Sequence, residues 1–153
     1  MATLIKSVVV VLVVFFFCIL IGIKSCGAAT LAQRNNNPVN LKAFVQWDGM
    51  TGRDKQGHAI FASLDYGIRA ALKNAQTRQR RQPNQTLRAW MNEFAEENGD
   101  QEAEYIARKM GISPTTALRD IDMTALVVHQ AMFEGRISLT VNQVLSVKQK
   151  FGI

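Results

Sequence analysis

An uncharged apolar run from residue 7 to residue 23, bounded by Lys6 and Lys24, is the feature that most constrains this chain. A helix with a rise of about 1.5 Å per residue would cover roughly 26 Å here, slightly less than the roughly 30 Å hydrocarbon layer of a bilayer. Neighbouring apolar residues and the long lysine side chains close that gap. β-Branched residues dominate the run, but a segment in lipid must satisfy its own backbone hydrogen bonds, which favours a helix. The sequence therefore predicts a single N-terminal transmembrane helix in residues 1–24, which contacts lipid through residues 4–24.

The same segment is compatible with a cleaved secretory signal, because a basic start, an apolar stretch and the small residues 27–29 follow one another. The apolar stretch is long for such a signal, so a retained anchor is the preferred interpretation. A lipidation signal at Cys26 fits less well, since Lys24 stands where such signals carry small or apolar residues. Positive charge is nearly equal on the two sides of the run and does not decide the orientation of the helix.

The rest of the chain has the composition of an ordinary soluble protein. Residues 25–33 are small or polar and predict a linker, and residues 34–153 predict one soluble domain. About 120 residues bury a modest core but are too few for a large cofactor-binding α/β fold. Both cysteines lie before residue 34, which excludes a catalytic cysteine or a cysteine-based zinc site in the domain.

The hydrophobic pattern of the domain predicts a mainly α fold with a small β-hairpin. Two short apolar pieces, 43–47 and 58–62, flank a loop rich in glycine and aspartate, as the strands of a hairpin would. Helices are expected from Ser63 to the polar stretch 77–85, from the N-cap Thr86 to about Asn98, from Asp100 to Met110, from Met123 to Phe133, and from Thr140 to Gly152.

Charged residues are segregated along the domain. Positions 69–88 carry six basic side chains and no acidic one, whereas positions 93–104 carry six acidic side chains and no basic one. One interpretation is two solvated helix faces that partly neutralise each other. The other is weak contact of Arg78, Arg80 and Arg81 with the phosphates of nucleic acid or lipid. No aromatic residue lies among these arginines, which disfavours sequence-specific base recognition.

An asparagine-rich turn, residues 35–40, opens the domain and carries its most unusual chemistry. Amide groups hydrogen-bond sugars and their N-acetyl groups, and the indole face of a tryptophan packs on a pyranose ring. In the alternative interpretation, the asparagines hydrogen-bond their own loop. The candidate substrate-binding residues are Arg34, Asn35, Asn36, Asn37, Asn40 and Trp47.

The motifs of residues 34–70 resemble those of a family of virion-associated or structural proteins of bacteriophages and prophages. The shared pattern consists of RNNNPVNL at 34–41, W-x-G at 47–49, T-G at 51–52, a short strand with Phe61, and GIRA at 67–70. Many members of this family are thought to be lysozyme-like modules that degrade peptidoglycan. The resemblance, which continues more loosely to the helix around His129, implies a lysozyme-like α+β fold for residues 34–153.

Two positions depart from the family pattern. Val39 stands where the family has glycine, and a β-branched residue resists the positive φ that glycine permits, so the turn is expected to be altered. Residues 133–136 are Phe-Glu-Gly-Arg where relatives tend to have His-Glu-Asn-Gly, and His129 lies one turn earlier.

Cleavage of a glycan requires a carboxylic acid that a partly apolar site keeps protonated, so that it can protonate the glycosidic oxygen. Glu134 is the best catalytic candidate, because it ends an otherwise apolar helix. Alternatively, it is an exposed helix-end carboxylate paired with Arg136. If Glu134 acts as the acid, either Asp48 or Asp65 serves as a second carboxylate, or the N-acetyl group of the substrate attacks internally, as in a transglycosylase.

No metal or cofactor is expected. His58 and His129 do not have the spacing of metal ligands, and His129 lies on an apolar helix face, which is typical of a core histidine. The sequence also lacks the motifs of acyl transfer, nucleotide hydrolysis and dinucleotide binding.

Together these features predict a membrane-anchored phage virion protein whose domain binds and cleaves peptidoglycan glycan strands during genome delivery, as a glycosidase or lytic transglycosylase. It would reside in the virion, in a virion membrane where the particle has one, or in the host cell envelope. One alternative is a non-enzymatic minor virion protein that links other virion proteins to the membrane. Another is a component of a secretion or conjugation machine. The enzymatic prediction depends on Glu134 and the asparagine-rich turn meeting at one groove.

Overall fold

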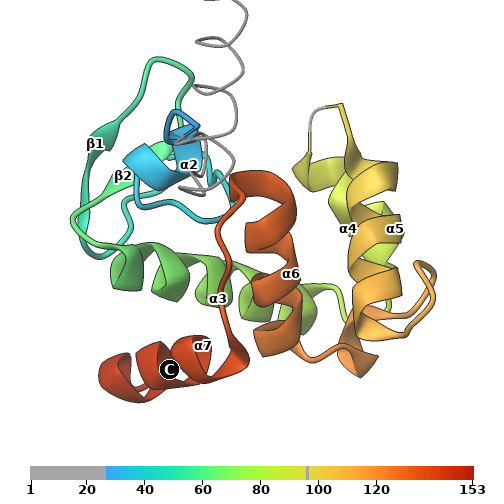
Figure 1. Ribbon diagram of the computed structural model, residues 1–153. Helices are drawn as coiled ribbons and strands as arrows, with labels where there is room; N and C mark the ends of the chain where they lie inside the picture. Colours follow the sequence, from blue (N-terminus) through green and yellow to red (C-terminus); the bar gives the residue numbers. More distant parts are fainter. Residues whose placement is uncertain (1–26, 96) are drawn as a thin grey trace, which may run out of the picture.

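The computed structural model describes residues 27–95 and 97–153, and it confirms a mainly α fold with a small antiparallel sheet (Figure 1). The predicted membrane helix lies outside these residues. None of the described helices is long and apolar enough to cross a bilayer. In chain order, the elements are α2 (Leu31–Arg34), β1 (Met50–Arg53), β2 (Ala59–Phe61), α3 (Leu64–Arg81), α4 (Leu87–Phe94), α5 (Gly99–Met110), the short 3₁₀ helix η1 (Leu118–Asp120), α6 (Met123–Gly135) and α7 (Val141–Phe151).

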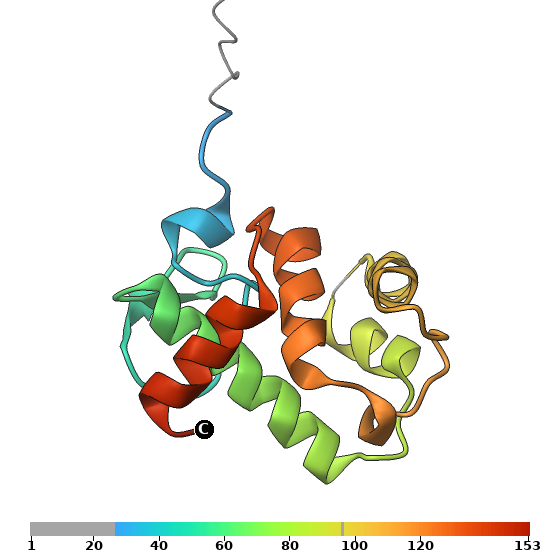
Figure 2. The same cartoon turned by 60° about the horizontal axis from the view of Figure 1, so that its bottom comes forward.

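Two lobes flank the central helix α6. The strands and α2 lie on one side of it, α4 and α5 lie on the other, and the long α3 connects the two sides (Figures 1 and 2). One hydrophobic core runs through both lobes, and its largest fully buried side chains include Phe61, Leu72, Met91, Ile106 and Leu126. Because these side chains come from β2, α3, α4, α5 and α6, the core holds the two lobes together.

The start of α4, the end of α5 and both ends of α7 follow the capping chemistry expected from the sequence, whereas α4 ends at Phe94 and not near Asn98. Thr86 accepts a hydrogen bond from a backbone N–H in the first turn of α4 (3.2 Å). Thr140 and Gln143 form a capping box at the start of α7. Gly111 and Gly152 follow α5 and α7 in the left-handed conformation that ends many helices.

The long helix α3 extends further than expected. The prediction that it dissolves from residue 77 is wrong, because the helix continues to Arg81. Arginine and glutamine favour helix even where no apolar face is present. The end of α3 lies instead just before Pro83, since a proline disfavours the α conformation of the residue that precedes it.

The hairpin uses a different first strand from the predicted one. The strand expected at 43–47 is wrong, and β1 lies inside the segment expected to be the loop. Phe44 and Val45 are consecutive and both exposed (89% and 54%), so this piece does not alternate inward and outward as a strand does. β1 pairs antiparallel with β2, which agrees with the predicted second strand, and Asp54 closes the turn by accepting two backbone N–H bonds (2.8 and 2.9 Å).

The folded part of the chain begins before residue 34. The segment expected to be a linker contains α2, whose start is capped by Thr30 together with Gln33. The Thr30 hydroxyl donates a hydrogen bond to the carbonyl of Gly135 (2.8 Å), and Ala32 is buried. These contacts fasten the beginning of the domain to the end of α6.

Candidate functional site

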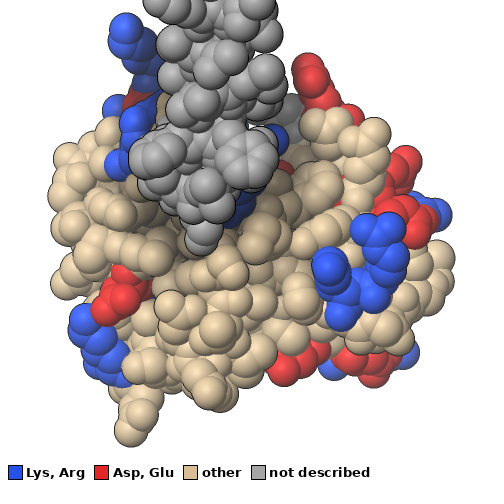
Figure 3. Space-filling model, in the orientation of Figure 1, with Lys and Arg blue, Asp and Glu red and all other residues tan. Residues whose placement is uncertain are grey.

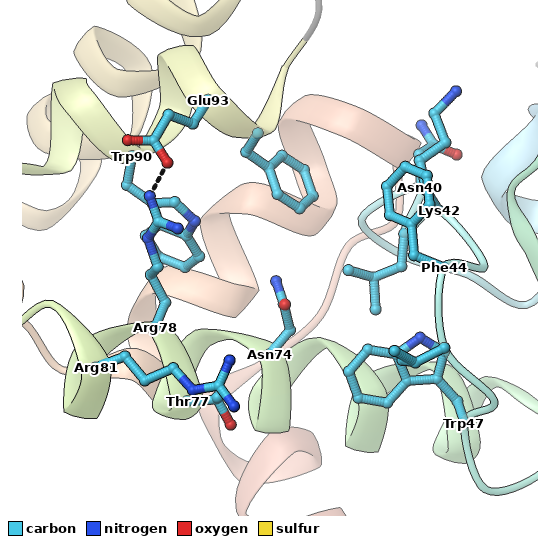
Figure 4. A pocket seen from close by; sticks show the side chains of 13 residues that line it. Asn40, Lys42, Phe44, Trp47, Asn74, Thr77, Arg78, Arg81, Trp90 and Glu93 are labelled. Atoms are coloured by element: carbon cyan, nitrogen blue, oxygen red, sulfur yellow. Dashed lines mark hydrogen bonds and ion pairs between the residues drawn. The ribbon is translucent and has the colours of Figure 1, made fainter.

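A groove of about 510 Å³ lies between the segment 40–47 and α4, over α3 (Figure 4). Phe44 and Trp47 line one side, and Glu93 with the neighbouring Phe94 lines the other. From α3, Asn74 and Thr77 line the base of the groove, and Arg78 and Arg81 lie toward α4. The groove thus combines aromatic surface with amide, hydroxyl and guanidinium groups, which is the usual make-up of a ligand site.

Glu134 lies in a second hollow that adjoins this groove. The hollow has a volume of about 220 Å³, and both cavities are lined by Asn40 and Phe94, so they meet at these two side chains. Glu97 and Asn98, from the loop between α4 and α5, line the other side of the hollow. Glu134 therefore lines the hollow, and the side chains of Asn40 and Phe94 lie between this hollow and the groove.

Asn40 contacts the candidate acid directly. Its side-chain amide donates to the Glu134 carboxylate (3.1 Å) and to the Glu134 backbone carbonyl (3.2 Å). Burial raises the pKa of the Glu134 carboxyl above its ordinary value, although the hydrogen bond from Asn40 and the charge of His58 oppose that rise. Glu134 is thus a partly buried carboxyl with an asparagine partner, and the expectation of an exposed residue paired with Arg136 does not hold.

The other three asparagines of the turn hydrogen-bond the protein itself. Asn37 is fully buried, donates to the carbonyls of Leu41 and Ala59, and accepts from the Leu41 N–H, each at 2.9 Å. Asn36 donates to a β2 carbonyl (3.0 Å), and Asn35 donates to the carboxylate of the hairpin turn (2.8 Å). These three side chains fasten the turn to the hairpin, as in the alternative interpretation made from the sequence.

The predicted substrate-binding residues therefore separate into two groups. Asn40 and Trp47 line the groove. Arg34 is exposed and donates to the carbonyl of Ala29 at the N-terminal side of α2. Asn35, Asn36 and Asn37 likewise hydrogen-bond parts of the protein outside the groove, and none of the four residues lines it. We therefore do not retain these four in the site.

Val39 does not distort the turn as expected. Among the described residues other than glycine, positive φ occurs at Asn36, Asn40 and Arg136, and Val39 instead packs in the core (1% exposed). Asparagine tolerates the left-handed region better than a β-branched residue does. In this region the backbone of α3 approaches the turn closely at Gly67, where a Cβ would lie 1.9 Å from the Asn36 carbonyl oxygen.

Two buried polar atoms of residues that line the groove have no hydrogen-bond partner among the described residues. They are the indole N–H of Trp47, which is a donor, and the side-chain oxygen of Asn40, which is an acceptor. Buried polar groups are normally satisfied, so these two atoms are exceptions among the described residues. Both are covered by surrounding protein atoms and do not belong to the open surface of the groove.

The proposed second carboxylates lie elsewhere. Asp48 pairs with Arg69, and Asp65 accepts a hydrogen bond from Lys150 (2.6 Å). Neither belongs to the residues that line the groove or the adjoining hollow. The second acidic side chain in the hollow is Glu97, which is exposed and was not singled out from the sequence.

Glu102 was not singled out from the sequence, because it lies in the run of acidic residues at 93–104, which predicts a solvated surface. It is completely buried, and burial together with the charge of Glu134 raises its pKa to about 8. Helical periodicity could have predicted its burial, because Glu102 lies one turn before the buried Ile106 and next to the buried Ala103.

The two charge runs neutralise each other in part. Arg78 pairs with Glu93, and Arg88 pairs with Asp100 (3.5 Å) and Glu104. Acidic and basic side chains accordingly lie next to each other over the α4–α5 side of the molecule in Figure 3. Contact of the arginines with phosphate remains a prediction.

The two histidines have different neighbours in the described domain. His58 contacts Asp54 (3.1 Å), and burial and the charge of Lys109 lower the pKa of the half-buried His129. In the part of the chain that the structure describes, no group of three or more histidine, cysteine, aspartate or glutamate side chains could hold a metal ion.

Comparison with known proteins gives no family for this chain. No family model matches it, and no curated protein sequence matches it.

Proposed function

We propose that the domain binds a glycan of N-acetylated amino sugars in the groove, and that Glu134 protonates the glycosidic oxygen. The observation that carries this proposal is a partly buried carboxyl with a raised pKa, hydrogen-bonded to Asn40, in a hollow that shares Asn40 and Phe94 with a groove lined with aromatic residues. A general acid needs such surroundings, because they favour the protonated form from which the proton is donated.

The lining of the groove suits a sugar chain. Trp47 and Phe94 provide apolar faces for pyranose rings. Asn74 and Thr77, at the base of the groove, carry amide and hydroxyl groups of the kind that hydrogen-bond acetamido and hydroxyl groups of sugars. A volume of about 510 Å³ falls within the size range of ligand sites, roughly 300–1,000 Å³.

The scheme uses Glu134 as its one protein carboxyl, because Glu97, the other acid of the hollow, is exposed. Asp48 and Asp65 are engaged with Arg69 and Lys150. In this scheme Glu134 gives its proton to the glycosidic oxygen, the bond from that oxygen to C1 breaks, and the acetamido carbonyl oxygen of the substrate bonds to C1. The Glu134 carboxylate then removes the proton from the O6 hydroxyl as O6 bonds to C1, which displaces the acetamido oxygen and gives a 1,6-anhydro sugar.

Two sequence features suggest where such a domain would act. The resemblance to phage virion proteins with lysozyme-like modules and the predicted helix in residues 1–24 support a membrane-anchored virion protein. Such a protein would act on peptidoglycan during genome delivery, from the virion or from the host envelope. The alternative is a virion component that uses the same groove for attachment without cleavage.

Incubation of the full chain, in detergent micelles, with insoluble peptidoglycan distinguishes these functions. We expect soluble muropeptides to appear with wild-type protein and not with Glu134→Gln, whereas the exposed Glu104→Gln serves as a matched control that retains activity. Retention of the wild-type protein on the wall without release of muropeptides, over a range of pH, would select the structural function. If the protein is neither retained on the wall nor releases muropeptides, the proposal that the groove binds glycan is wrong.

A further inference from the structure

The folded domain begins a few residues after the segment that the sequence predicts to lie in a bilayer. The apolar run ends at residue 23, and Thr30 caps the start of α2. A fully extended chain from residue 23 to residue 30 reaches at most about 25 Å. A domain of this size is roughly 35 Å across. The predicted anchor would therefore hold the end of the domain that carries α2 closer to the bilayer than the width of the domain itself.

Two other segments meet α2 at this end of the domain. The turn that follows α6 is joined to α2 by a hydrogen bond from the Gln33 side chain to the carbonyl of Arg136 (3.4 Å). The turn of the hairpin is joined to it by the hydrogen bond from Asn35 to Asp54 (2.8 Å). The three segments thus form one surface around the start of the folded chain (Figures 1 and 2).

Each of the three segments carries exposed basic side chains. We call the set the basic end, and its members are Arg34, Arg53, Lys55 and Arg136. None of the four forms an ion pair with an acidic side chain of the described residues. Basic side chains accordingly lie over the hairpin at the upper left of Figure 3. This differs from the α4–α5 side, where basic and acidic side chains pair.

The acidic side chains of the same segments are turned inward. Asp54 lies between two members of the basic end in the sequence, but its side chain is only 12% exposed and contacts Asn35 and His58. Glu134, just before the turn that follows α6, is partly buried and accepts the hydrogen bond from Asn40. The outward charge of this surface is therefore positive.

We propose that the basic end docks on the anionic headgroups of the bilayer that holds residues 4–24, and so fixes the orientation of the domain on the membrane. Each lysine or arginine near an anionic lipid surface strengthens binding by roughly fivefold. The short tether makes the contact intramolecular, so it needs only modest intrinsic affinity. The inference does not rest on cleavage of glycan.

The proposal selects a different surface from the lipid contact predicted for the arginines at the end of α3. Arg80 and Arg81 are exposed as well, but the end of α3 lies far from α2 in both views of the fold (Figures 1 and 2). The two surfaces would therefore turn different sides of the domain toward the bilayer, which an experiment can distinguish.

NMR of the full chain in lipid nanodiscs that contain a gadolinium-chelating lipid tests the docking. Amide signals near the membrane are weakened by the metal, and we expect stronger weakening at Lys55 and Gly57 than at Gly152, which follows α7. The effect should require phosphatidylglycerol beside phosphatidylcholine. It should also decrease from about 0.1 M to about 1 M salt, because the screening length falls from about 10 Å to about 3 Å.

Two double variants that remove equal charge from exposed side chains identify the surface. Arg53→Gln with Lys55→Gln should lower the ratio of docked to undocked domain by roughly 25-fold, as expected for two lost charges. Arg80→Gln with Arg81→Gln should leave the ratio nearly unchanged, because these side chains lie far from the basic end.

Several results would overturn the inference. Equal weakening of the Lys55 and Gly57 signals with and without phosphatidylglycerol would show tethering without docking. Loss of the lipid response in the Arg80 and Arg81 variant alone would assign the contact to α3. Shifts of the Lys55 and Gly57 signals with a DNA duplex, but not with phosphatidylglycerol, would assign the surface to nucleic acid. Failure of the full chain to insert into nanodiscs would remove the tether. Docking by a protein that never cleaves glycan would support this inference and reject the enzymatic function.

Discussion

Replacement of Glu102 by glutamine should change how the stability of the domain depends on pH. The carboxyl has a pKa of about 8 in the folded state against an ordinary value of 4.5, so the folded state holds more protons between these values. A raised pKa contributes stability that is complete below the unfolded pKa and is lost as pH rises toward the folded pKa. Wild type therefore loses stability through this group across the window from about pH 4.5 to about pH 8.

The magnitude follows from the width of the window. Each pH unit within it is worth about 1.4 kcal/mol, so the Glu102 contribution falls by about 3 kcal/mol between pH 5 and pH 7. Glutamine has a similar shape and does not titrate. The free energy of unfolding of Glu102→Gln, relative to wild type, should therefore rise by about 3 kcal/mol over the same interval. This is a large part of the roughly 5–15 kcal/mol that stabilises a typical domain.

Urea unfolding at pH 5, 6 and 7 measures this difference, with tryptophan fluorescence as the signal. The two tryptophans of the chain, Trp47 and Trp90, both lie in the described domain. His129, whose lowered pKa has the opposite effect on stability, is present in both proteins and cancels in the difference. Glu104→Gln, on the same helix but exposed, should show a difference from wild type that stays within about 1 kcal/mol. A Glu102→Gln difference that stays constant from pH 5 to pH 7 would refute the assignment of Glu102 as a buried protonated acid.

Three further predictions concern the turn and the groove. Asn37→Ala removes three buried hydrogen bonds and should lower the free energy of unfolding by about 2–4 kcal/mol in the same urea assay; a loss below about 1 kcal/mol would contradict the structural role of this side chain. Gly67→Ala should prevent the turn from packing on α3 and strongly lower the midpoint of thermal unfolding. Gly27→Ala, with open space around it, should have no effect. Equal midpoints for the two variants would contradict the close approach of Gly67 to Asn36. Trp47→Ala should weaken retention on insoluble peptidoglycan by roughly tenfold or more without unfolding the domain, and unchanged retention would remove Trp47 from the binding surface.

Local chemistry made several features predictable. Helix caps depend on hydrogen bonds and backbone conformations within a few residues, so they can be predicted from sequence order alone. The structure shows such caps at Thr86, Gly111, Thr140 and Gly152. The position of Glu134 at the end of an apolar helix was equally visible, since α6 carries few polar residues.

Features that depend on distant contacts were not predictable in the same way. Residues 43–47 are apolar enough for a strand, but Phe44 and Val45 are exposed beside the groove. The asparagine-rich turn contains four similar amides, and only the folded hairpin determines that Asn40 approaches Glu134 while Asn37 bonds the backbone. Composition alone could not separate these roles.

The burial of Glu102 illustrates the limit of charge counting. Its neighbours Asp100 and Glu104 are exposed, and six acids within 93–104 predict a solvated surface. The helix phase of α5, however, places position 102 on the same face as Ile106. A periodicity argument applied to each acid separately would have identified it.

The rate at which purified peptidoglycan glycan strands are cleaved by the full chain tests the central claim most directly. Mass spectrometry of the products gives both the rate and the nature of the new sugar end. We predict cleavage with 1,6-anhydro ends for wild type, and a rate at least roughly 100-fold lower for Glu134→Gln, because a positioned general acid contributes about 10²–10⁴-fold. No cleavage by wild type between pH 4 and pH 8, or equal rates for the two proteins, would contradict the account.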